Sequence, residues 1–457
     1  MSTLTVVNQP AEHTDTYRRD PYFEGAPSKC DATRYKIYSI EDAKRLFRGR
    51  DVYIWGAGQK GRGFLLALRR CGFEAKGFLD SNPQMVGTEY MGVRVYHPDQ
   101  TLKVPDAGEK VFVLTATVDL KNKEIFATLE QEYGFVRGRS FENIQALSPL
   151  YPTIEVTGLC NLRCSSCPRS DASMLENGKF MSYANYERVI HKLVREIPFV
   201  YLVDLYMWGE PLLNPEIADV IRLNNSLGIA SGLSTNLNNV RNLEAAMEAY
   251  PAQIRVSLSG MSKETYEVTH TGGKWDQVSK NMEFLSKVNE KFGNRTIVEL
   301  YFHLYQHNLH EVPAIVELCK RYNFRFHPSL AILLHDFPLA YLETGRLPES
   351  AQAAKDRLLI DLDTLIDDCE KQTDRNCILT RVAPVINWDM SVMPCCTFAY
   401  TGIARSYLEI SLADLLDRRT YSSTCASCQK HALHRWNDQG YYSGYVQNVV
   451  KNAVAQA

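Results

Sequence analysis

Three cysteines lie close together in the middle of the chain, in the phrase Gly-Leu-Cys-Asn-Leu-Arg-Cys-Ser-Ser-Cys-Pro. They are Cys160, Cys164 and Cys167, and they directly follow a short apolar segment that is typical of a strand. A loop with this spacing can wrap around a 4Fe–4S cluster and give thiolates to three of its irons. The fourth iron then has no protein ligand, and catalytic metal sites keep such an open position. A zinc site and unbound thiols are the alternatives, but structural zinc needs four ligands and no histidine is close in the sequence.

Four further short segments follow the cysteine motif along the chain. They are Trp208-Gly209-Glu210-Pro211, Ser234-Thr235-Asn236, Val256-Ser257-Leu258-Ser259-Gly260 and His307-Asn308. Together with the cysteine motif they resemble the signature of the radical S-adenosylmethionine (SAM) superfamily. The resemblance implies that SAM binds at the open iron of the cluster and receives one electron. Methionine is then released with a 5′-deoxyadenosyl radical, which takes a hydrogen atom from the substrate.

The same resemblance assigns the cofactor contacts. The residues expected to contact SAM are Gly209, Glu210, Pro211, Ser234, Asn236, Ser257 and Ser259. The Glu210 carboxylate can accept charged hydrogen bonds from the methionine ammonium group. One segment departs from the pattern, because His270-Thr271-Gly272-Gly273 stands where many relatives have an arginine before two glycines.

A second group of cysteines lies in the C-terminal part of the chain. It consists of Cys377, Cys395, Cys425 and Cys428, with a hairpin-like Val-Ile-Asn-Trp-Asp-Met-Ser-Val-Met-Pro stretch before Cys395. The group resembles the Twitch or shortened SPASM extension of the same superfamily, which implies an auxiliary 4Fe–4S cluster. Zinc is the alternative for four thiolates, and Cys396 is an alternative ligand to Cys395. Asp389-Met390 replaces the usual Asp-Gly at the hairpin tip.

A glycine-rich turn near the N-terminus has the spacing of a nucleotide-binding fingerprint. Gly56, Gly58 and Gly61 lie between an apolar segment and a helical one, and Asp80 ends the next apolar segment. Glycines let the backbone approach a phosphate closely, and a helix amino end favours negative charge. A tight turn without a ligand is the alternative. The region resembles small nucleotide-binding domains of sugar-modifying enzymes, which favours a nucleotide-linked sugar or a substrate tether over NAD.

Alternating strand and helix patterns predict an α/β protein. In the N-terminal part, residues 51–58 have the pattern of a strand that ends in a glycine turn, and 74–79 and 111–115 have strand patterns too. With helical segments between them, they predict a small Rossmann-like domain. The strands expected in the central part are 153–157, 201–206, 232–234, 255–258, 298–304 and 325–328. The helices expected between them are 183–196, 215–226, 243–249, 277–288 and 311–322. Six such units predict a partial (β/α)6 parallel barrel.

These patterns divide the chain into five parts. They are a mobile tail (1–35), a Rossmann-like nucleotide-binding domain (36–150), the radical SAM partial barrel (151–346), a helical bridge (347–376) and a small cysteine-rich Twitch/SPASM-like extension (377–457).

The composition of the chain indicates which binding partners and which cellular compartment to expect. The formal net charge is −2, so nothing indicates a nucleic acid or an anionic membrane as partner. No apolar run is long enough to span a membrane and the start lacks a signal-peptide pattern, so we expect a cytoplasmic protein. The 12 cysteines then indicate metal or redox chemistry rather than disulfides. Arg69-Arg70 and Arg418-Arg419 are expected on solvated faces, and Cys30, Cys71, Cys319 and Cys369 are expected to be ordinary buried or surface thiols.

The sequence therefore favours a radical SAM enzyme that acts on a small molecule, such as a sugar or a nucleotide-linked metabolite. The expected outcome is dehydrogenation, deoxygenation or rearrangement. A one-electron reductant such as flavodoxin or ferredoxin is the expected partner. The alternatives are an enzyme that matures a peptide or protein, and a cluster-binding or nucleotide-sensing protein without enzymatic activity.

Overall fold

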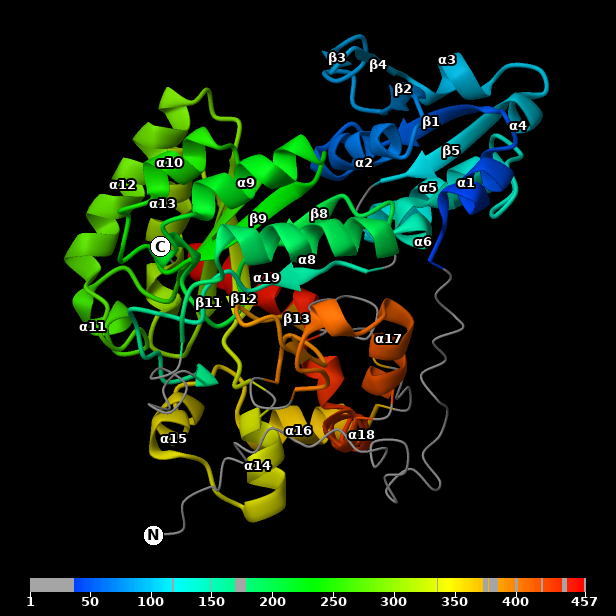
Figure 1. Cartoon of the computed structure of the whole chain (residues 1–457). Coiled ribbons are helices and arrows are strands. Elements are labelled where there is room, and N and C mark those ends of the chain that lie inside the picture. Colours follow the sequence, from blue (N-terminus) through cyan, green and yellow to red (C-terminus); the bar gives the residue numbers. More distant parts are fainter. Residues whose placement is uncertain are drawn as a thin grey trace.

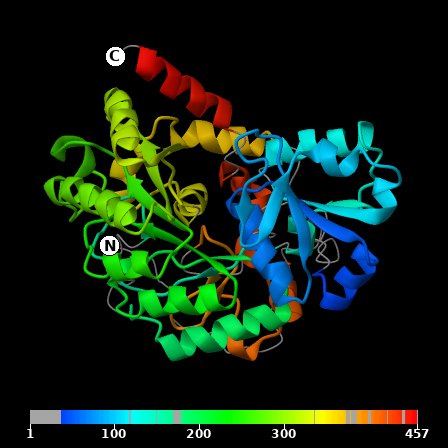
Figure 2. The same cartoon turned by 90° about the horizontal axis from the view of Figure 1, so that it is seen from above.

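The chain folds around two sheets, which lie side by side with helices around each (Figures 1 and 2). The computed structural model describes residues 37–116, 119–148, 150–168, 178–334, 336–372, 377, 385–398, 402–420, 422–437 and 442–455. A six-stranded sheet belongs to the N-terminal part of the chain, and an eight-stranded sheet belongs to the rest. The expected mobile tail (1–35) and Cys30 lie outside the described residues.

The N-terminal sheet has the order β3-β4-β2-β1-β5-β6. Its strands are β1 (Asp51–Trp55), β2 (Ala75–Leu79), β3 (Glu89–Tyr90), β4 (Val93–Tyr96), β5 (Val111–Thr115) and β6 (Phe141–Asn143). Neighbours pair in parallel except β3 and β4. The chain proceeds outward from β1 to β4 and then returns to β5 on the other side of β1. The order therefore reverses between β1 and β5, as in doubly wound sheets.

Six helices accompany this sheet. They are α1 (Ile40–Phe47), α2 (Gln59–Arg70), α3 (Pro98–Leu102), α4 (Ala107–Lys110), α5 (Asp119–Gln131) and α6 (Ile144–Leu147). Helix α1 begins with a capping box between Ser39 and Asp42. Gly58 is the N-cap of helix α2, which buries Phe64, Leu65 and Leu68 in the core of this part.

The central part contains all six expected strands, paired in parallel and in sequence order. They are β7 (Thr153–Ile154), β8 (Leu202–Asp204), β9 (Ala230–Thr235), β10 (Gln253–Leu258), β11 (Ile297–Leu304) and β12 (Arg325–Leu330). The helices of this part are α8 (Tyr183–Glu196), α9 (Ile217–Ser226), α10 (Leu243–Glu248), α11 (Lys263–Tyr266), α12 (Trp275–Lys291) and α13 (Val312–Tyr322). A partial parallel barrel results, and the carboxyl ends of its strands share one rim.

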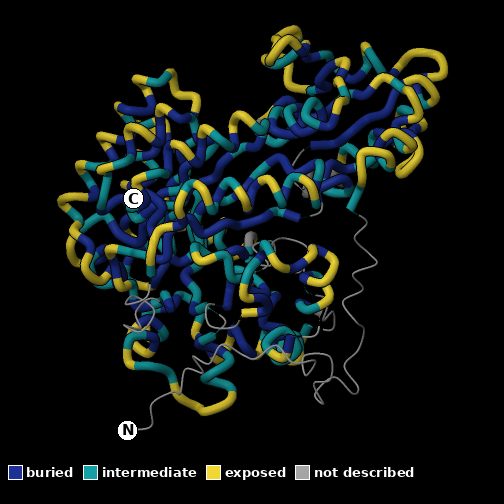
Figure 3. The backbone as a smooth tube through the Cα atoms, in the orientation of Figure 1, coloured by how far each residue is buried: buried dark blue, intermediate teal, exposed yellow. Residues whose placement is uncertain are grey.

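The strands alternate between an apolar and a polar face. In β11, Val298, Leu300, Phe302 and Leu304 are buried in the large core cluster of the barrel. The intervening Glu299, Tyr301 and His303 lie on the opposite face, because successive side chains of a strand point to opposite sides. Figure 3 shows the buried core along the strands and the exposed outer turns of the helices.

The C-terminal hairpin belongs to the barrel sheet. Its strands β13 (Val385–Ile386) and β14 (Val392–Met393) pair antiparallel, as expected, and β13 also pairs in parallel with β7. Met390 at the tip has a φ of +70°, the left-handed conformation that a glycine would adopt without strain. The sequence predicted the hairpin but not its attachment to the first barrel strand.

The remaining helices lie around the hairpin and beside the barrel (Figure 1). They are α14 (Asp336–Thr344), α15 (Glu349–Lys355), α16 (Leu362–Glu370), α17 (Leu412–Thr420), α18 (Ser423–Lys430) and α19 (Ser443–Ala455). Helices α15 and α16 lie in the segment expected to be a helical bridge. Helix α19 contacts α13 and β12, so the end of the chain packs on the barrel.

The prediction that both basic pairs lie on solvated faces is wrong for one arginine of each. Arg419 is only 2% exposed. The Arg70 guanidinium donates to the carbonyls of Pro198 and Leu227, at 2.8 and 2.7 Å. These carbonyls precede β8 and β9, so the N-terminal part contacts the barrel at the amino ends of its strands.

Other sequence expectations agree with the structure. Cys71, Cys319 and Cys369 are buried thiols, as expected. No helix within the described part of the chain is long and apolar enough to cross a membrane.

Candidate functional site

The loop after β7 brings Cys160, Cys164 and Cys167 together. All three are half-buried, and the Cys167 backbone N–H donates to the Cys164 carbonyl at 3.0 Å. Burial raises the pKa of the Cys164 thiol well above its ordinary value, and the neighbouring Cys167 and Cys160 raise it further. A cation that binds three such thiols would favour their thiolate forms. Their close grouping at the carboxyl end of the first barrel strand fits the cluster that the sequence predicts.

The segment after β8 lies directly against this cysteine loop. A Cβ atom on Gly209 would be 1.8 Å from the Thr157 carbonyl oxygen, so only glycine fits there. The Glu210 backbone N–H donates to the Leu159 carbonyl at 2.8 Å, and Pro211 begins a 3-10 helix. Glu155 supports the same segment, because its carboxylate accepts from the backbone N–H groups of Trp208 and Gly209 at 2.8 and 2.9 Å. The sequence analysis did not single out Glu155, a polar residue within an apolar strand pattern.

Glu210 is a buried carboxyl group at the centre of the rim. It is 2% exposed and accepts hydrogen bonds from the backbone N–H groups of Leu212 and Asn236 at 3.2 and 2.8 Å. Burial nevertheless raises its pKa to about 7. Glu210 forms no ion pair with any other described residue, so a bound ammonium group would supply its counter-charge.

Asn236 connects the carboxyl end of β9 to the cysteine loop. Its side-chain amide donates to the Cys160 sulfur at 3.7 Å and to the Asn161 side chain at 3.0 Å. A donor at a thiolate ligand stabilises the anion and influences the potential of a bound cluster. The sequence analysis expected Asn236 to contact SAM, and the structure adds a direct contact with Cys160, an expected cluster ligand.

The three serines expected to contact the cofactor fall into two positions. Ser234 and Ser257 lie on the polar face of β9 and β10, with their hydroxyl oxygens 3.4 Å apart. Ser259 is buried and contacts the hydroxyl of Thr269 and Nδ1 of His270, at 2.6 and 2.9 Å. Ser259 therefore supports the loop that carries His270.

The segment that departs from the superfamily pattern closes onto the cysteine loop. The Thr271 carbonyl accepts from the Arg163 backbone N–H at 2.9 Å. His270 stacks on Tyr266 with ring centroids 4.4 Å apart, and burial lowers the pKa of His270 to about 4. A neutral histidine thus occupies this position. Asn308 is also fully buried and donates to the carbonyls of Ser259 and His303, so it joins the loops after β10 and β11.

Comparison with known families agrees with this arrangement. Residues 154–319 match the model of the Radical SAM superfamily. The chain contains a radical SAM domain. Members of this superfamily are enzymes that use a 4Fe–4S cluster and SAM.

The chain also has curated relatives. It is 28% identical over 173 residues to GTP 3′,8-cyclase of Synechocystis sp., covering 37% of this chain and 50% of that protein. It is 25% identical over 203 residues to AdoMet-dependent heme synthase of Methanosarcina barkeri, covering 44% of this chain and 53% of that protein. The chain thus spans about half the length of these curated relatives.

Solved radical SAM structures resemble the chain at low sequence identity. Streptococcus suis SuiB bound to S-adenosylmethionine has a TM-score of 0.42 and 13% identity, over 69% of this chain and 79% of that chain. BtrN in complex with AdoMet and 2-DOIA has a TM-score of 0.36 and 15% identity, over 63% of this chain and 89% of that chain.

The interior of the radical SAM barrel carries polar residues that the sequence analysis missed. Arg255 lies over the Tyr301 ring, 3.7 Å from its centroid, and Tyr301 stacks on His327 at 3.9 Å. Burial raises the pKa of Asp204 to about 6 and lowers that of His303 to about 3. Strand alternation would have placed these side chains on one face if the strand register had been known.

The second group of cysteines surrounds a separate hollow. Its lining includes Cys377, Cys395, Cys425 and Cys428, together with Arg419 and His434. Cys396 is not part of this lining, so Cys395 is the better placed of the two adjacent cysteines. Burial raises the pKa of Cys425 to about 12, with a further contribution from Cys395. Among the described residues, no three cysteine, histidine or acidic side chains converge closely enough to hold a single metal ion.

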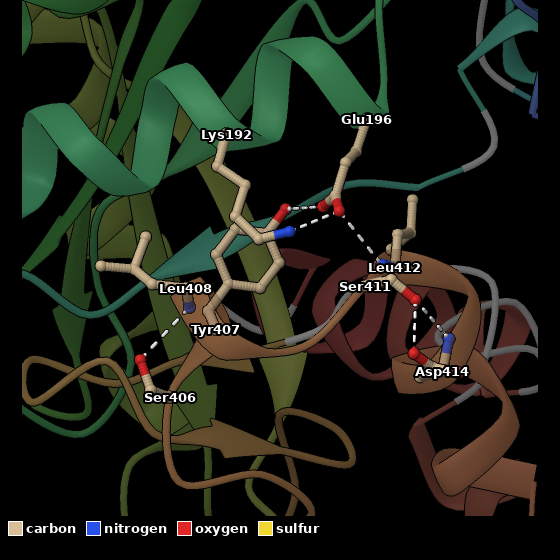
Figure 4. Close-up of polar contacts among 8 residues, drawn as sticks. All are labelled: Lys192, Glu196, Ser406, Tyr407, Leu408, Ser411, Leu412 and Asp414. Carbon is tan, nitrogen blue, oxygen red and sulfur yellow. Dashed lines mark hydrogen bonds and ion pairs between the residues drawn. The ribbon is translucent and has the colours of Figure 1, made fainter.

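A polar contact fastens this C-terminal region to the barrel (Figure 4). The Tyr407 hydroxyl donates to Glu196 at 2.7 Å, and the Leu412 backbone N–H donates to the same carboxylate at 3.2 Å. Lys192 pairs with Glu196 one helical turn away and lies over the Tyr407 ring. One carboxylate at the end of α8 therefore holds both Tyr407 and the start of α17.

The N-terminal glycine turn forms as expected at the end of β1. Gly56 has a φ of +116°, and a Cβ atom on Gly61 would be 1.9 Å from the Gly56 carbonyl oxygen. Asp80 accepts from the Ala57 backbone N–H at 3.2 Å, so its carboxylate supports the turn. The space around Gly58 is open, with no atom within 4 Å of an added Cβ. Because the N-terminal part contacts the amino ends of the barrel strands, the cysteine loop lies at the opposite end of the barrel.

Proposed function

We propose that the protein cleaves SAM reductively at a 4Fe–4S cluster held by Cys160, Cys164 and Cys167, and takes a hydrogen atom from a small polar molecule. A sugar or nucleotide-linked metabolite is the favoured substrate class, and its dehydrogenation, deoxygenation or rearrangement is the favoured outcome. The observation that carries this proposal is the grouping of three thiols with Asn236 and Glu210 at the rim of the barrel.

The chain's own residues bind and orient the reactants in this mechanism. Cys160, Cys164 and Cys167 would hold the cluster, which when reduced would supply the electron for cleavage of SAM to methionine and a 5′-deoxyadenosyl radical. Glu210 holds the methionine ammonium group by a charged hydrogen bond. Asn236 donates to the Cys160 thiolate, and the lack of a side chain at Gly209 allows the close approach of the two loops.

The polar interior of the barrel supports a polar substrate. The face below the rim offers the carboxyl group of Asp204, the guanidinium of Arg255 and the hydroxyl of Tyr301.

We further propose an auxiliary 4Fe–4S cluster held by Cys377, Cys395, Cys425 and Cys428, and a nucleotide site at Gly56, Gly58, Gly61 and Asp80. Four thiols around one hollow support the first. The open space at Gly58 beside a helix amino end supports the second. A one-electron reductant of the flavodoxin or ferredoxin type would serve as partner.

The test is anaerobic incubation of the reconstituted enzyme with SAM, dithionite and pooled cell metabolites. We expect 5′-deoxyadenosine above the level formed without metabolites. The Cys160→Ala/Cys164→Ala/Cys167→Ala variant should form none. A wild-type enzyme that forms no 5′-deoxyadenosine would refute the proposal. If only the peptide fraction raises 5′-deoxyadenosine formation, the substrate is a peptide and not a small molecule.

A further inference from the structure

The polar face inside the barrel contains a half-buried arginine, Arg255, in the middle of β10. Its neighbours in register are Ser234 on β9 and Glu299 on β11. It precedes Ser257, which is an expected SAM contact, by two residues along the same face. Arg255 therefore lies below the cofactor segments, where a substrate that reacts with the radical would sit.

Arg255 has hydrogen-bonding capacity that the described part of the chain does not use. Arg255 forms no ion pair there, and its buried Nε–H has no hydrogen-bond partner. Its guanidinium lies over the ring of Tyr301, 3.7 Å from the centroid. The guanidinium also interacts with the Asp204 carboxyl and forms a hydrogen bond with the Tyr206 side chain, which hold part of it in place. A buried N–H donor without an acceptor is costly, and an oxygen of an anionic ligand would supply that acceptor.

The groups around Arg255 add hydrogen-bonding capacity. Tyr301 and His327 stack on each other across β11 and β12, and His303 lies two residues further toward the rim. A neutral imidazole keeps one N–H donor. A guanidinium flanked by such donors matches the planar geometry of a carboxylate or the tetrahedral geometry of a phosphate.

We propose that Arg255 binds an anionic group of the substrate, a carboxylate or a phosphate, and thereby fixes the reacting part of the molecule below SAM. This inference rests on the proposed function and restricts it, because it excludes neutral sugars as substrates. It also separates this anion site from the glycine turn, which lies beyond the opposite end of the barrel.

The test is isothermal titration of the anaerobic holoenzyme, loaded with SAM, with three matched probes: glucose 1-phosphate, glucuronate and glucose. We expect at least one anionic probe to bind at least tenfold more tightly than glucose, and the better probe identifies phosphate or carboxylate. Arg255→Gln should weaken that binding at least tenfold, and Arg255→Lys should weaken it less. Arg325→Gln, which changes an exposed arginine of β12, should leave it unchanged.

Two outcomes would overturn the inference: no preference for either anionic probe over glucose, or equal binding by the wild type and Arg255→Gln. Formation of 5′-deoxyadenosine by the wild-type preparation is measured in parallel. Cleavage of SAM without an anion preference refutes only the role of Arg255, whereas absence of cleavage refutes the proposed function itself.

Discussion

At the scale of single residues, Glu210 gives the sharpest test of the cofactor site. Replacing it by glutamine removes a charged hydrogen bond to the SAM ammonium, worth about 1.5–3 kcal/mol, and should weaken SAM binding roughly 10- to 150-fold. The pKa of Glu210 is about 7 before SAM binds, and binding favours the ionised form. SAM affinity should therefore be highest above pH 7 and fall by up to about tenfold per pH unit below it.

Equilibrium titration of the reconstituted enzyme with SAM between pH 6 and 8 measures both effects. The iron content of Glu210→Gln serves as the control and should equal that of the wild type. A wild-type affinity that does not change with pH, or a variant that binds SAM normally, would show that Glu210 does not meet the ammonium group.

Arg419 provides a second prediction at this scale. It lines the hollow with the four C-terminal cysteines and is 2% exposed, so its charge acts at short range and with little screening. A nearby cation favours the more negative, reduced form of a cluster. Arg419→Gln should therefore lower the midpoint potential of the auxiliary cluster by on the order of tens of millivolts, and Arg419→Lys should lower it less.

Redox titration followed by electron paramagnetic resonance measures these potentials, and the SAM-binding cluster is the internal control. Equal shifts of both clusters would indicate a general structural effect. An unchanged auxiliary potential in Arg419→Gln would show that the arginine has only a packing role.

At the scale of elements, the contact between α8 and the C-terminal region is the feature to test. The Tyr407 hydroxyl is buried and donates to the Glu196 carboxylate, so Tyr407→Phe should cost about 1.5–3 kcal/mol of unfolding free energy. Glu196→Gln should also destabilise the protein. Because the two changes remove one shared interaction, their effects should be less than additive by at least about 0.5 kcal/mol.

Denaturant unfolding of the wild type, both single variants and the double variant completes the cycle. Additive effects would show that the two side chains are not energetically coupled. Hydrogen exchange should locate the loss of protection in α17 and in the end of α8.

The whole molecule is predicted to hold two clusters at separate sites. The reconstituted wild type should contain about eight irons and eight sulfides. Removing Cys160, Cys164 and Cys167 together should eliminate half, and removing Cys377, Cys395, Cys425 and Cys428 should eliminate the other half. Cys396→Ala is the control, because Cys396 does not line the hollow, and it should retain all the iron. About four irons with one zinc in the wild type would refute the auxiliary cluster.

The N-terminal part gives the last prediction at this scale. The space at Gly58 is open, so Gly58→Val should fit the folded chain but obstruct a phosphate at the start of α2. We expect nucleotides or nucleotide sugars to bind the full-length protein and to lose at least tenfold in affinity in this variant. SAM cleavage in the absence of substrate should not change, because the cysteine loop lies at the other end of the barrel. Calorimetry measures this binding. If the wild-type protein shows no affinity for any nucleotide, the proposed nucleotide site is refuted.

The sequence by itself determined the elements and the set of cysteines that we propose as cluster ligands. Strand and helix periods are local, so the six barrel strands, α8 with its bounds and the C-terminal hairpin were predictable. The cysteine spacing is local too, because the three thiols of one loop cannot lie far apart.

Only the tertiary structure decided which distant residues meet. Contacts between segments remote in sequence decide the pairing of β13 with β7, the hydrogen bonds of Arg70 and the burial of Arg419. They also decide that Cys395, and not Cys396, lines the hollow. The polar face with Arg255 likewise depends on strand register, since a shift by one residue would reverse the two faces. Local sequence sets chain geometry within a few residues, whereas these features follow from the packing of the whole chain.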